Sequence, residues 1–322
     1  MLKRSALIVA ALTLVACGGD ATAASRTTNS AGVNGLRFNG EKVGVSDRPV
    51  AVTASSASIW ASSVTRGTLS EIDPDTHKRV GAPIRVGRAP YSVHYAFNRV
   101  WVAGFRDDTL VAVDPSTRRA ARPVAVPDRP FGIADGFGSL WVGGVSRGVV
   151  SRVDPATGVV VGAPIVIDGV PHGIATGVAL VWVVDIRDNQ VVRIDPATGR
   201  IAGEPVPVGV LPSAIAVRDG VVWVANARHG TVVRLSEATG QRLGRPIRVA
   251  ARPVAIAVDA TSAWVVSLDG DALTRIDVKT GKADRLPILI GDAPSDVTLT
   301  PSGLWVANGK DDEVVNYASG PS

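Results

Sequence analysis

The residues of this chain best suited to acid–base, nucleophilic or metal chemistry are four histidines and one cysteine. His172 and Asp185 are expected at the start and end of two adjacent strands, where they could hydrogen-bond and leave the imidazole as a base. A purely structural link is the other interpretation of that pair. We expect His94 in the core and His77 in a turn. Because serine-nucleophile, phosphate-loop and Cys/His zinc motifs are missing from the sequence, we assign no catalytic residue, no metal site and no cofactor.

Cys17, the only cysteine, follows an export-type segment. Lys3 and Arg4 precede the apolar stretch 6–15, which is too short to span a bilayer. The stretch Leu14-Val15-Ala16-Cys17 resembles a bacterial lipobox, which implies lipidation of Cys17 after cleavage. An ordinary secretory signal with an incidental cysteine is the alternative. We therefore predict a signal peptide at 1–17, a disordered tether at 18–34, and a folded domain at 35–322, exported and anchored to the cell membrane.

The length and composition allow one large repeat domain or two ordinary ones with a substantial core. Apolar residues make up 46% of the 322 residues, and the formal net charge is +5. Basic side chains alternate with aspartates, and no run of like charge occurs, so we predict no nucleic-acid partner. We expect a monomer.

Seven tryptophans recur at intervals of 40 or 41 residues: Trp60, Trp101, Trp141, Trp182, Trp223, Trp264 and Trp305. A proline stands 11 residues before each of them, from Pro49 to Pro294. Such a period is typical of repeat architectures. The fourth repeat, taken as the template, contains four short segments separated by turn residues. The sequence therefore predicts an all-β fold, a seven-bladed β-propeller of four-stranded antiparallel blades.

Three features of the repeat are predicted to be structural. The tryptophans should fill the gaps between neighbouring blades, each with its N–H bonded nearby, because one indole recurs in every repeat. The recurring Asp-Pro-x-Thr segments should be hairpin turns rather than catalytic carboxylates. The last repeat is too short for a fourth strand, so residues 36–45 should pair with 312–318 and close the ring.

A candidate ligand site comes from the residues that differ between repeats. The position after the proline holds Tyr91, Phe131 and His172 in blades two to four, near the mouth of the central channel. Arginines and one histidine lie in loops of the same face and could hold an acidic group: Arg88, Arg129, Arg187, Arg228 and His229, with Asp185 beside them. The alternative is that these arginines form an ordinary solvated surface.

The segments Trp223-Val224-Ala225-Asn226 and Trp305-Val306-Ala307-Asn308 each lead into an apolar strand, and an Asp-Pro-Ala-Thr-Gly-like turn follows in most repeats. This pattern resembles the YVTN repeat of YncE-like β-propellers over about residues 36–318, with Trp replacing Tyr and Ala replacing Thr. The resemblance implies a secreted or surface-attached propeller and carries little information on function.

The stretch Pro171-His172-Gly173-Ile174 resembles a repeat element of streptogramin B lyase-like propellers, whose metal-assisted site uses His and Glu at the mouth. Their Glu three positions after Trp is not found here, and only Asp185 offers a carboxylate at that position. We therefore favour a non-enzymatic module that binds an envelope or extracellular peptide, glycan or protein. A metal-dependent lyase or lactone-type hydrolase is the first alternative, and a purely structural envelope protein is the second.

Overall fold

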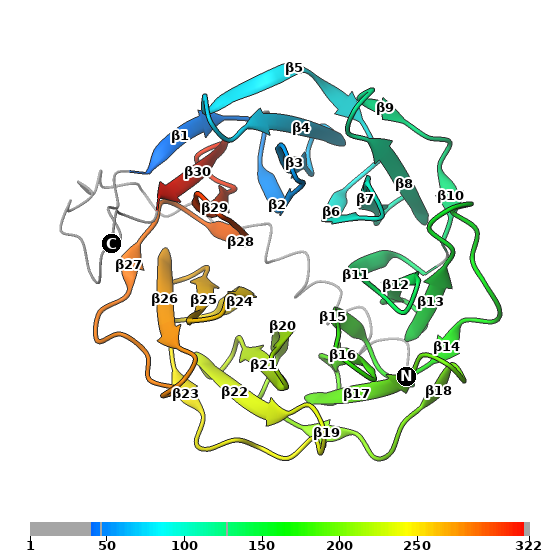
Figure 1. Ribbon diagram of the computed structural model, residues 1–322, viewed down its shortest axis with the longest axis vertical. Helices are drawn as coiled ribbons and strands as arrows, with labels where there is room; N and C mark the ends of the chain where they lie inside the picture. Colours follow the sequence, from blue (N-terminus) through cyan, green and yellow to red (C-terminus); the bar gives the residue numbers. More distant parts are fainter. Residues whose placement is uncertain (1–39, 46, 127, 319–322) are drawn as a thin grey trace.

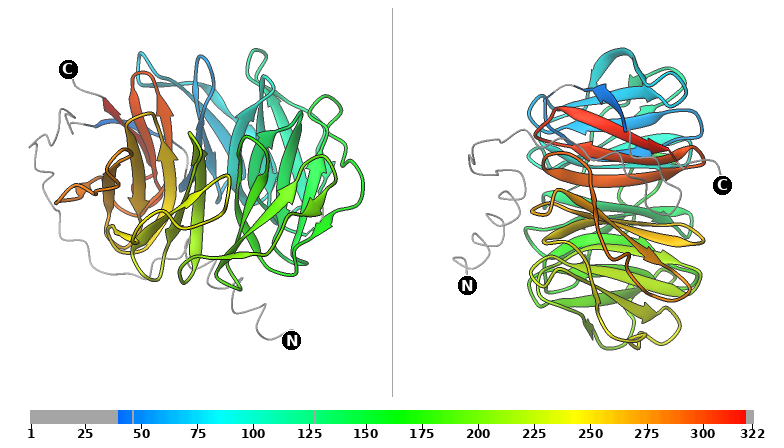
Figure 2. Two further views of the ribbon diagram at one scale, coloured as in Figure 1. Left: turned by 60° about the horizontal axis from the view of Figure 1, so that its bottom comes forward. Right: turned by 90° about the vertical axis from the view of Figure 1, so that its left-hand side faces the viewer.

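The computed structural model describes residues 40–45, 47–126 and 128–318. Seven antiparallel sheets surround a central axis, and all named elements of these residues are strands (Figure 1). This confirms the predicted seven-bladed β-propeller. In side view the blades stand next to one another around a disc (Figure 2). Among the described residues, we find no helical segment with the length and apolarity that a membrane span requires.

The first four blades follow one another around the ring. Blade one comprises β2 (Pro49–Ala54), β3 (Ile59–Ser63), β4 (Thr68–Asp73) and β5 (Lys78–Arg85). Blade two comprises β6 (Pro90–Ala96), β7 (Arg99–Gly104), β8 (Thr109–Asp114), β9 (Arg119–Ala120) and β10 (Val124–Ala125). Blade three comprises β11 (Pro130–Gly136), β12 (Ser139–Gly144), β13 (Val149–Val153) and β14 (Ile165–Val166). Blade four comprises β15 (Pro171–Thr176), β16 (Val181–Asp185), β17 (Gln190–Asp195), β18 (Arg200–Ile201) and β19 (Val206–Pro207).

The remaining three blades complete the ring. Blade five comprises β20 (Pro212–Arg218), β21 (Val221–Asn226), β22 (Thr231–Ser236) and β23 (Ile247–Arg248). Blade six comprises β24 (Pro253–Val258), β25 (Ser262–Ser267), β26 (Ala272–Asp277) and β27 (Ile288–Leu289). Blade seven comprises β28 (Pro294–Thr300), β29 (Gly303–Asn308), β30 (Glu313–Ala318) and, as its outer strand, β1 (Glu41–Gly44).

The outer strand of blade four is divided into two pieces within 200–207. β18 and β19 are two-residue strands that both pair with β17. Pro205 and Pro207 lie in this stretch. Proline lacks a backbone donor and is therefore tolerated only at a sheet edge, where it also limits strand length.

The tryptophans lie between blades, as predicted. All seven are at most 5% exposed. Trp182 of blade four, for example, packs against Val222, Val224 and Leu235 of blade five. Burial of one such side chain contributes about 2–3 kcal/mol. The expected N–H bond exists in four blades, such as Trp101 to the Ala96 carbonyl at 3.1 Å, but the expectation is wrong for Trp182, Trp223 and Trp305.

Blades three to six add an arginine on the indole face. Trp182 and Arg193 are cross-strand partners on β16 and β17, and the guanidinium carbon lies 5.8 Å from the indole centroid. The same pairing joins Trp141 to Arg152, Trp223 to Arg234 and Trp264 to Arg275. These cation–π contacts stabilise each indole beyond its apolar burial.

The ring closes through the N-terminal strand. β1 pairs with β30 from Glu41 opposite Asn316 to Gly44 opposite Glu313 (Figure 1). This confirms the predicted closure for the part of 36–45 that the structure describes. Val43 is 4% exposed and joins Trp305 in one apolar cluster with blade one. Closure therefore removes the edge that a seventh blade of three strands would leave.

The Asp-Pro-x-Thr segments are hairpin turns, as predicted. In blade four the Asp195 carboxylate accepts hydrogen bonds from the backbone N–H groups of Ala197 and Thr198, at 2.8 and 3.3 Å. These bonds lower the pKa of Asp195. The corresponding aspartates of blades one, two and three bond in the same way. The carboxylates are therefore occupied in holding the turns.

Candidate functional site

The seven innermost strands surround a central cavity of about 450 Å³. Each of these strands begins at the recurring proline, and the residue after the proline is left out of the ladder by a β-bulge. In blade two, Pro90 pairs with Gly104 and Ser92 with Ala103, so Tyr91 has no cross-strand partner. A bulge re-aims the side chain of its extra residue. This local geometry presents the variable position of each repeat to the cavity.

Tyr91, Phe131 and His172 form a continuous row along the cavity wall, called here the aromatic row. The ring centroids of Tyr91 and Phe131 are 5.9 Å apart, and those of Phe131 and His172 are 4.3 Å apart. Phe105 packs edge-on against Tyr91 at 5.3 Å and is 4% exposed. The row therefore has a rigid apolar support and forms one aromatic surface across three blades.

His172 is held in its neutral form. Its Nδ1 lies 2.6 Å from the carbonyl oxygen of Ser213 on the next blade, which requires Nδ1 to carry the proton. Burial lowers the pKa of His172 to about 4. The unprotonated Nε2 is left as an acceptor.

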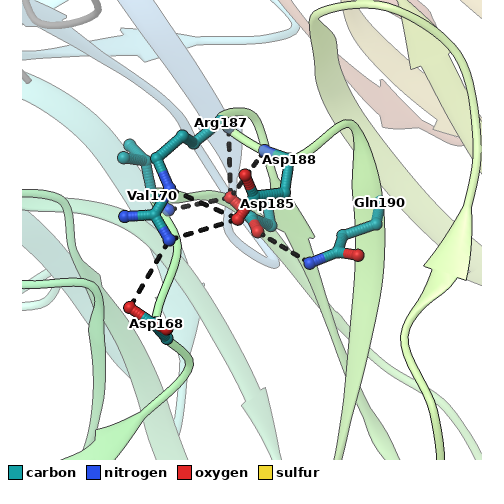
Figure 3. Close-up of polar contacts among 6 residues, drawn as sticks. All are labelled: Asp168, Val170, Asp185, Arg187, Asp188 and Gln190. Atoms are coloured by element: carbon teal, nitrogen blue, oxygen red, sulfur yellow. Dashed lines mark hydrogen bonds and ion pairs between the residues drawn. The ribbon is translucent and has the colours of Figure 1, made fainter. Parts of the chain in front are cut away.

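The hydrogen bond suggested between His172 and Asp185 is not formed, which corrects that expectation. Asp185 is fully buried, and its carboxylate accepts bonds from the backbone N–H of Val170 at 2.8 Å and of Arg187 at 3.1 Å (Figure 3). The amide of Gln190 adds a third bond at 3.0 Å. Asp185 thus joins the two loops at the mouth of blade four and is not presented to the cavity.

The predicted arginines are spread around the ring. Arg88 pairs with Asp107 at 2.5 Å, and the guanidinium of Arg129 lies 5.7 Å from the Phe105 centroid. Arg187 pairs with Asp188 at 3.1 Å and with Asp168 at 3.5 Å (Figure 3).

Arg228 and His229 lie in the loop between β21 and β22 of blade five, away from the aromatic row of blades two to four. Only Arg129 touches the apolar support of the row. A shared acidic-group site of all these arginines therefore stays a prediction.

Asp296 is a cavity residue that the sequence analysis missed. It stands two residues after the proline, where the other blades carry Ala, Ser or Gly. Its carboxylate accepts hydrogen bonds from the backbone N–H of Val52 on blade one and of Val297, each at 2.9 Å. Burial nevertheless raises the pKa of Asp296 to about 7. The break in the repeat at this position was the available signal.

His94 is also a cavity residue, which corrects its assignment to the core. Its Nε2 lies 2.7 Å from the Asp135 carboxylate of the next blade, and its side chain is 30% exposed. This contact keeps the pKa of Asp135 below its usual value. The cavity wall thus has an aromatic part in blades two to four and a polar part formed by His94, Asp296 and Thr53.

The cavity does not fit a resident divalent ion. Such an ion needs several oxygen ligands. The described residues bring no three His, Cys, Asp or Glu side chains together, and both oxygens of Asp296 already accept backbone bonds.

No protein-family model and no curated protein matches this chain. Solved structures with a similar fold include virginiamycin B lyase from Staphylococcus aureus, which is 16% identical with a TM-score of 0.77 over 87% of this chain and 99% of that one. A streptogramin B lyase is 16% identical with a TM-score of 0.76, over 86% and 97% of the two chains. Hydrazine synthase from Kuenenia stuttgartiensis is 16% identical with a TM-score of 0.74, over 86% and 98%. At this identity the similarity shows the shared propeller fold alone.

Proposed function

We propose that this protein is an exported, lipid-anchored propeller that binds a peptide, glycan or protein partner of the cell envelope without catalysing a reaction. The observation that carries the proposal is the aromatic row at the wall of the central cavity. Tyr91 and Phe131 are partly exposed and lie on the buried Phe105, so they offer a preformed apolar face at little ordering cost. Aromatic side chains on rigid supports are typical anchors of binding sites.

The chemistry of the row favours binding over catalysis. One nitrogen of His172 is bonded to the Ser213 carbonyl, and the carboxylate of Asp185, its predicted partner, accepts hydrogen bonds from the Val170 and Arg187 backbone and the Gln190 side chain. Neither residue has a second catalytic group beside it in the manner of a nucleophile–base pair. The free Nε2 of His172 instead offers a hydrogen-bond acceptor at one end of an apolar strip, which suits a peptide N–H or a sugar hydroxyl.

The test is a pull-down from native envelope with the full chain and with Phe131→Ala. Val254→Ala is the matched control, because Val254 occupies the same repeat position in blade six and lines the same cavity. We expect Phe131→Ala to lose the partner and Val254→Ala to retain it. Equal retention by both variants would refute a site on the aromatic row.

The anchor is tested separately, because Cys17 lies outside the described residues. We expect Cys17→Ala to abolish labelling by a radioactive fatty acid and to release the protein from the membrane fraction. Labelling that persists in the variant would exclude lipidation at this cysteine.

The lyase alternative rests on the shared fold of the streptogramin B lyases. It requires a divalent ion, for which the described residues offer no ligand set. Stabilisation of the chain by Mg²⁺ or Ca²⁺ that His172→Ala abolishes would favour the enzyme over the binding module.

A further inference from the structure

A second cavity, of about 910 Å³, opens between blades one and two. It is called here the arginine pocket, because five arginines line it: Arg48, Arg66, Arg85, Arg88 and Arg106. Arg48 precedes β2, Arg66 lies between β3 and β4, and Arg85 ends β5. Arg88 lies between β5 and β6, and Arg106 follows β7. Tyr91 lines both this pocket and the central cavity. The arginine pocket therefore lies beside one end of the aromatic row.

The repeat supplies an internal comparison for these five positions. At the next junction, between blades two and three, the equivalent residues include no arginine: Ala89, Asp107, Ala125, Asp128 and Ser146. The junction of blades three and four carries three, at Arg129, Arg147 and Arg187, and every other junction carries at most one. The propeller fold thus does not require arginine at any of these positions, and their coincidence at one junction needs another explanation.

Carboxylates balance only part of the positive charge in the arginine pocket. Arg66 pairs with Asp47, and Arg88 pairs with Asp107. The guanidinium groups of Arg48, Arg85 and Arg106 make no ion pair or hydrogen bond with the described residues. The nearby Asp312 accepts the backbone N–H of Arg48 at 2.6 Å. Three cationic side chains that have no partner among the residues of the described ranges therefore line one cavity.

At the junction of blades three and four, all three arginines have partners within the protein. There, Arg147 pairs with Asp128 at 2.6 Å, and Arg187 pairs with Asp188 at 3.1 Å. Arg129 lies over the ring of Phe105. Each arginine at that junction has a partner within the protein, whereas the arginine pocket leaves three guanidinium groups available to an external anion.

We propose that the arginine pocket is a binding site for a phosphate-bearing ligand with two or more negative charges. Guanidinium groups match phosphate oxygens in bidentate geometry. A phosphate monoester carries about −1.5 to −2 charges at neutral pH and three acceptor oxygens, whereas a carboxylate balances only one arginine. The ligand is either a free phosphorylated molecule or the headgroup of an anionic phospholipid, which share this chemistry. The inference goes beyond the proposed function, since the pocket needs no occupant in the central cavity.

The test is calorimetric titration of the full chain with inorganic pyrophosphate. Arg85→Ala removes one unpaired guanidinium, and Arg248→Ala is the matched control. Arg85 and Arg248 occupy the same register of the outer strand, opposite Thr68 and Thr231, and both are exposed. Loss of one charge-assisted contact should weaken binding about tenfold in Arg85→Ala, and Arg248→Ala should bind like the wild type. Binding should also weaken with added salt.

Three results would overturn the proposal: no binding by the wild type, equal binding by Arg85→Ala, or equal loss in both variants. Phe131→Ala should bind pyrophosphate normally, so failure of the pocket and failure of the aromatic row are distinguishable.

A second experiment identifies the source of the phosphate. The full chain carrying Cys17→Ser, which cannot be acylated, is mixed with phosphatidylcholine vesicles with and without phosphatidic acid, whose headgroup is a phosphate monoester. Retention on phosphatidic acid vesicles that Arg85→Ala abolishes would assign a lipid headgroup. Pyrophosphate binding without such retention would assign a soluble phosphorylated ligand.

Discussion

The carboxylate of Asp296 on the last blade accepts a hydrogen bond from the backbone N–H of Val52 on the first blade, at 2.9 Å. The ring is thus closed both at its outer edge and at its inner wall. β1 joins β30 at the outer edge, and the Asp296–Val52 bond joins the innermost strands β28 and β2. The inner closure uses a titratable group, so it makes the closed ring sensitive to pH.

Asp296 and His172 should give opposite pH dependences of stability. The folded-state pKa of Asp296 is raised to about 7, so the folded state holds a proton that the unfolded state releases, and stability falls as pH rises from about 4 to 7. The folded-state pKa of His172 is lowered to about 4, so stability falls as pH decreases from about 6.5 to 4.

The contributions of Asp296 and His172 to the free energy of unfolding should nearly cancel in the wild type between pH 4 and 6.5. In Asp296→Asn only the histidine contributes, so stability should increase with pH over this range. In His172→Gln only the aspartate contributes, so stability should decrease with pH. Melting temperatures measured at half-unit pH steps check this. Parallel profiles of the two variants would contradict it.

Outer closure should depend on Val43. Val43→Asp places a charge in the cluster of Trp305 and Val314, and we expect it to cost roughly 3 kcal/mol of unfolding free energy. Val178→Asp is the control, because Val178 is 84% exposed. Urea unfolding measures both. A cost for Val43→Asp no greater than that of the control would show that β1 contributes little to closure.

The indole–guanidinium pairs should be energetically coupled. Trp182→Ala should cost roughly 3–5 kcal/mol. A double-mutant cycle with Arg193→Ala should give a coupling of about 0.5–2 kcal/mol. Trp101 is the comparison, because its cross-strand partner is Ala112. Unfolding free energies of the single and double variants provide the value, and a coupling near zero would assign all the stability of Trp182 to apolar burial.

Gly132 should be required for the spacing of the aromatic row. A Cβ at this position would overlap the carbonyl oxygen of His172 on the next blade, which is backbone and cannot give way cheaply. Gly132→Ala should therefore lower the melting temperature and weaken partner binding. Gly44→Ala is the control, because nothing lies within 4 Å of its added Cβ. Normal binding by Gly132→Ala would show that the row tolerates a shift of blade four.

The aromatic row could be predicted because its signal is a difference between repeats at one position. Asp296 also differs from the residues at the same position of the other repeats, one residue further from the proline. A comparison of the seven repeats at that position would have identified Asp296. The arginine pocket needs five positions on two blades, and its meaning depends on which arginines find a carboxylate. Ion pairing between loops follows from their conformations, which a single sequence does not encode locally.

The amino-acid sequence by itself determined the number of blades, the inner strands and the closure of the ring, because the tryptophan and proline periods reflect local strand geometry and repeated burial. Only the tertiary structure decided the partners of the polar groups. His172 bonds Ser213 rather than Asp185, and His94 bonds Asp135, because each inner strand faces the next blade more closely than it faces the loops of its own. Contacts between residues about 41 positions apart depend on the β-bulges and on the angles between blades, which set the direction of each side chain. The repeat period of the sequence does not specify these directions.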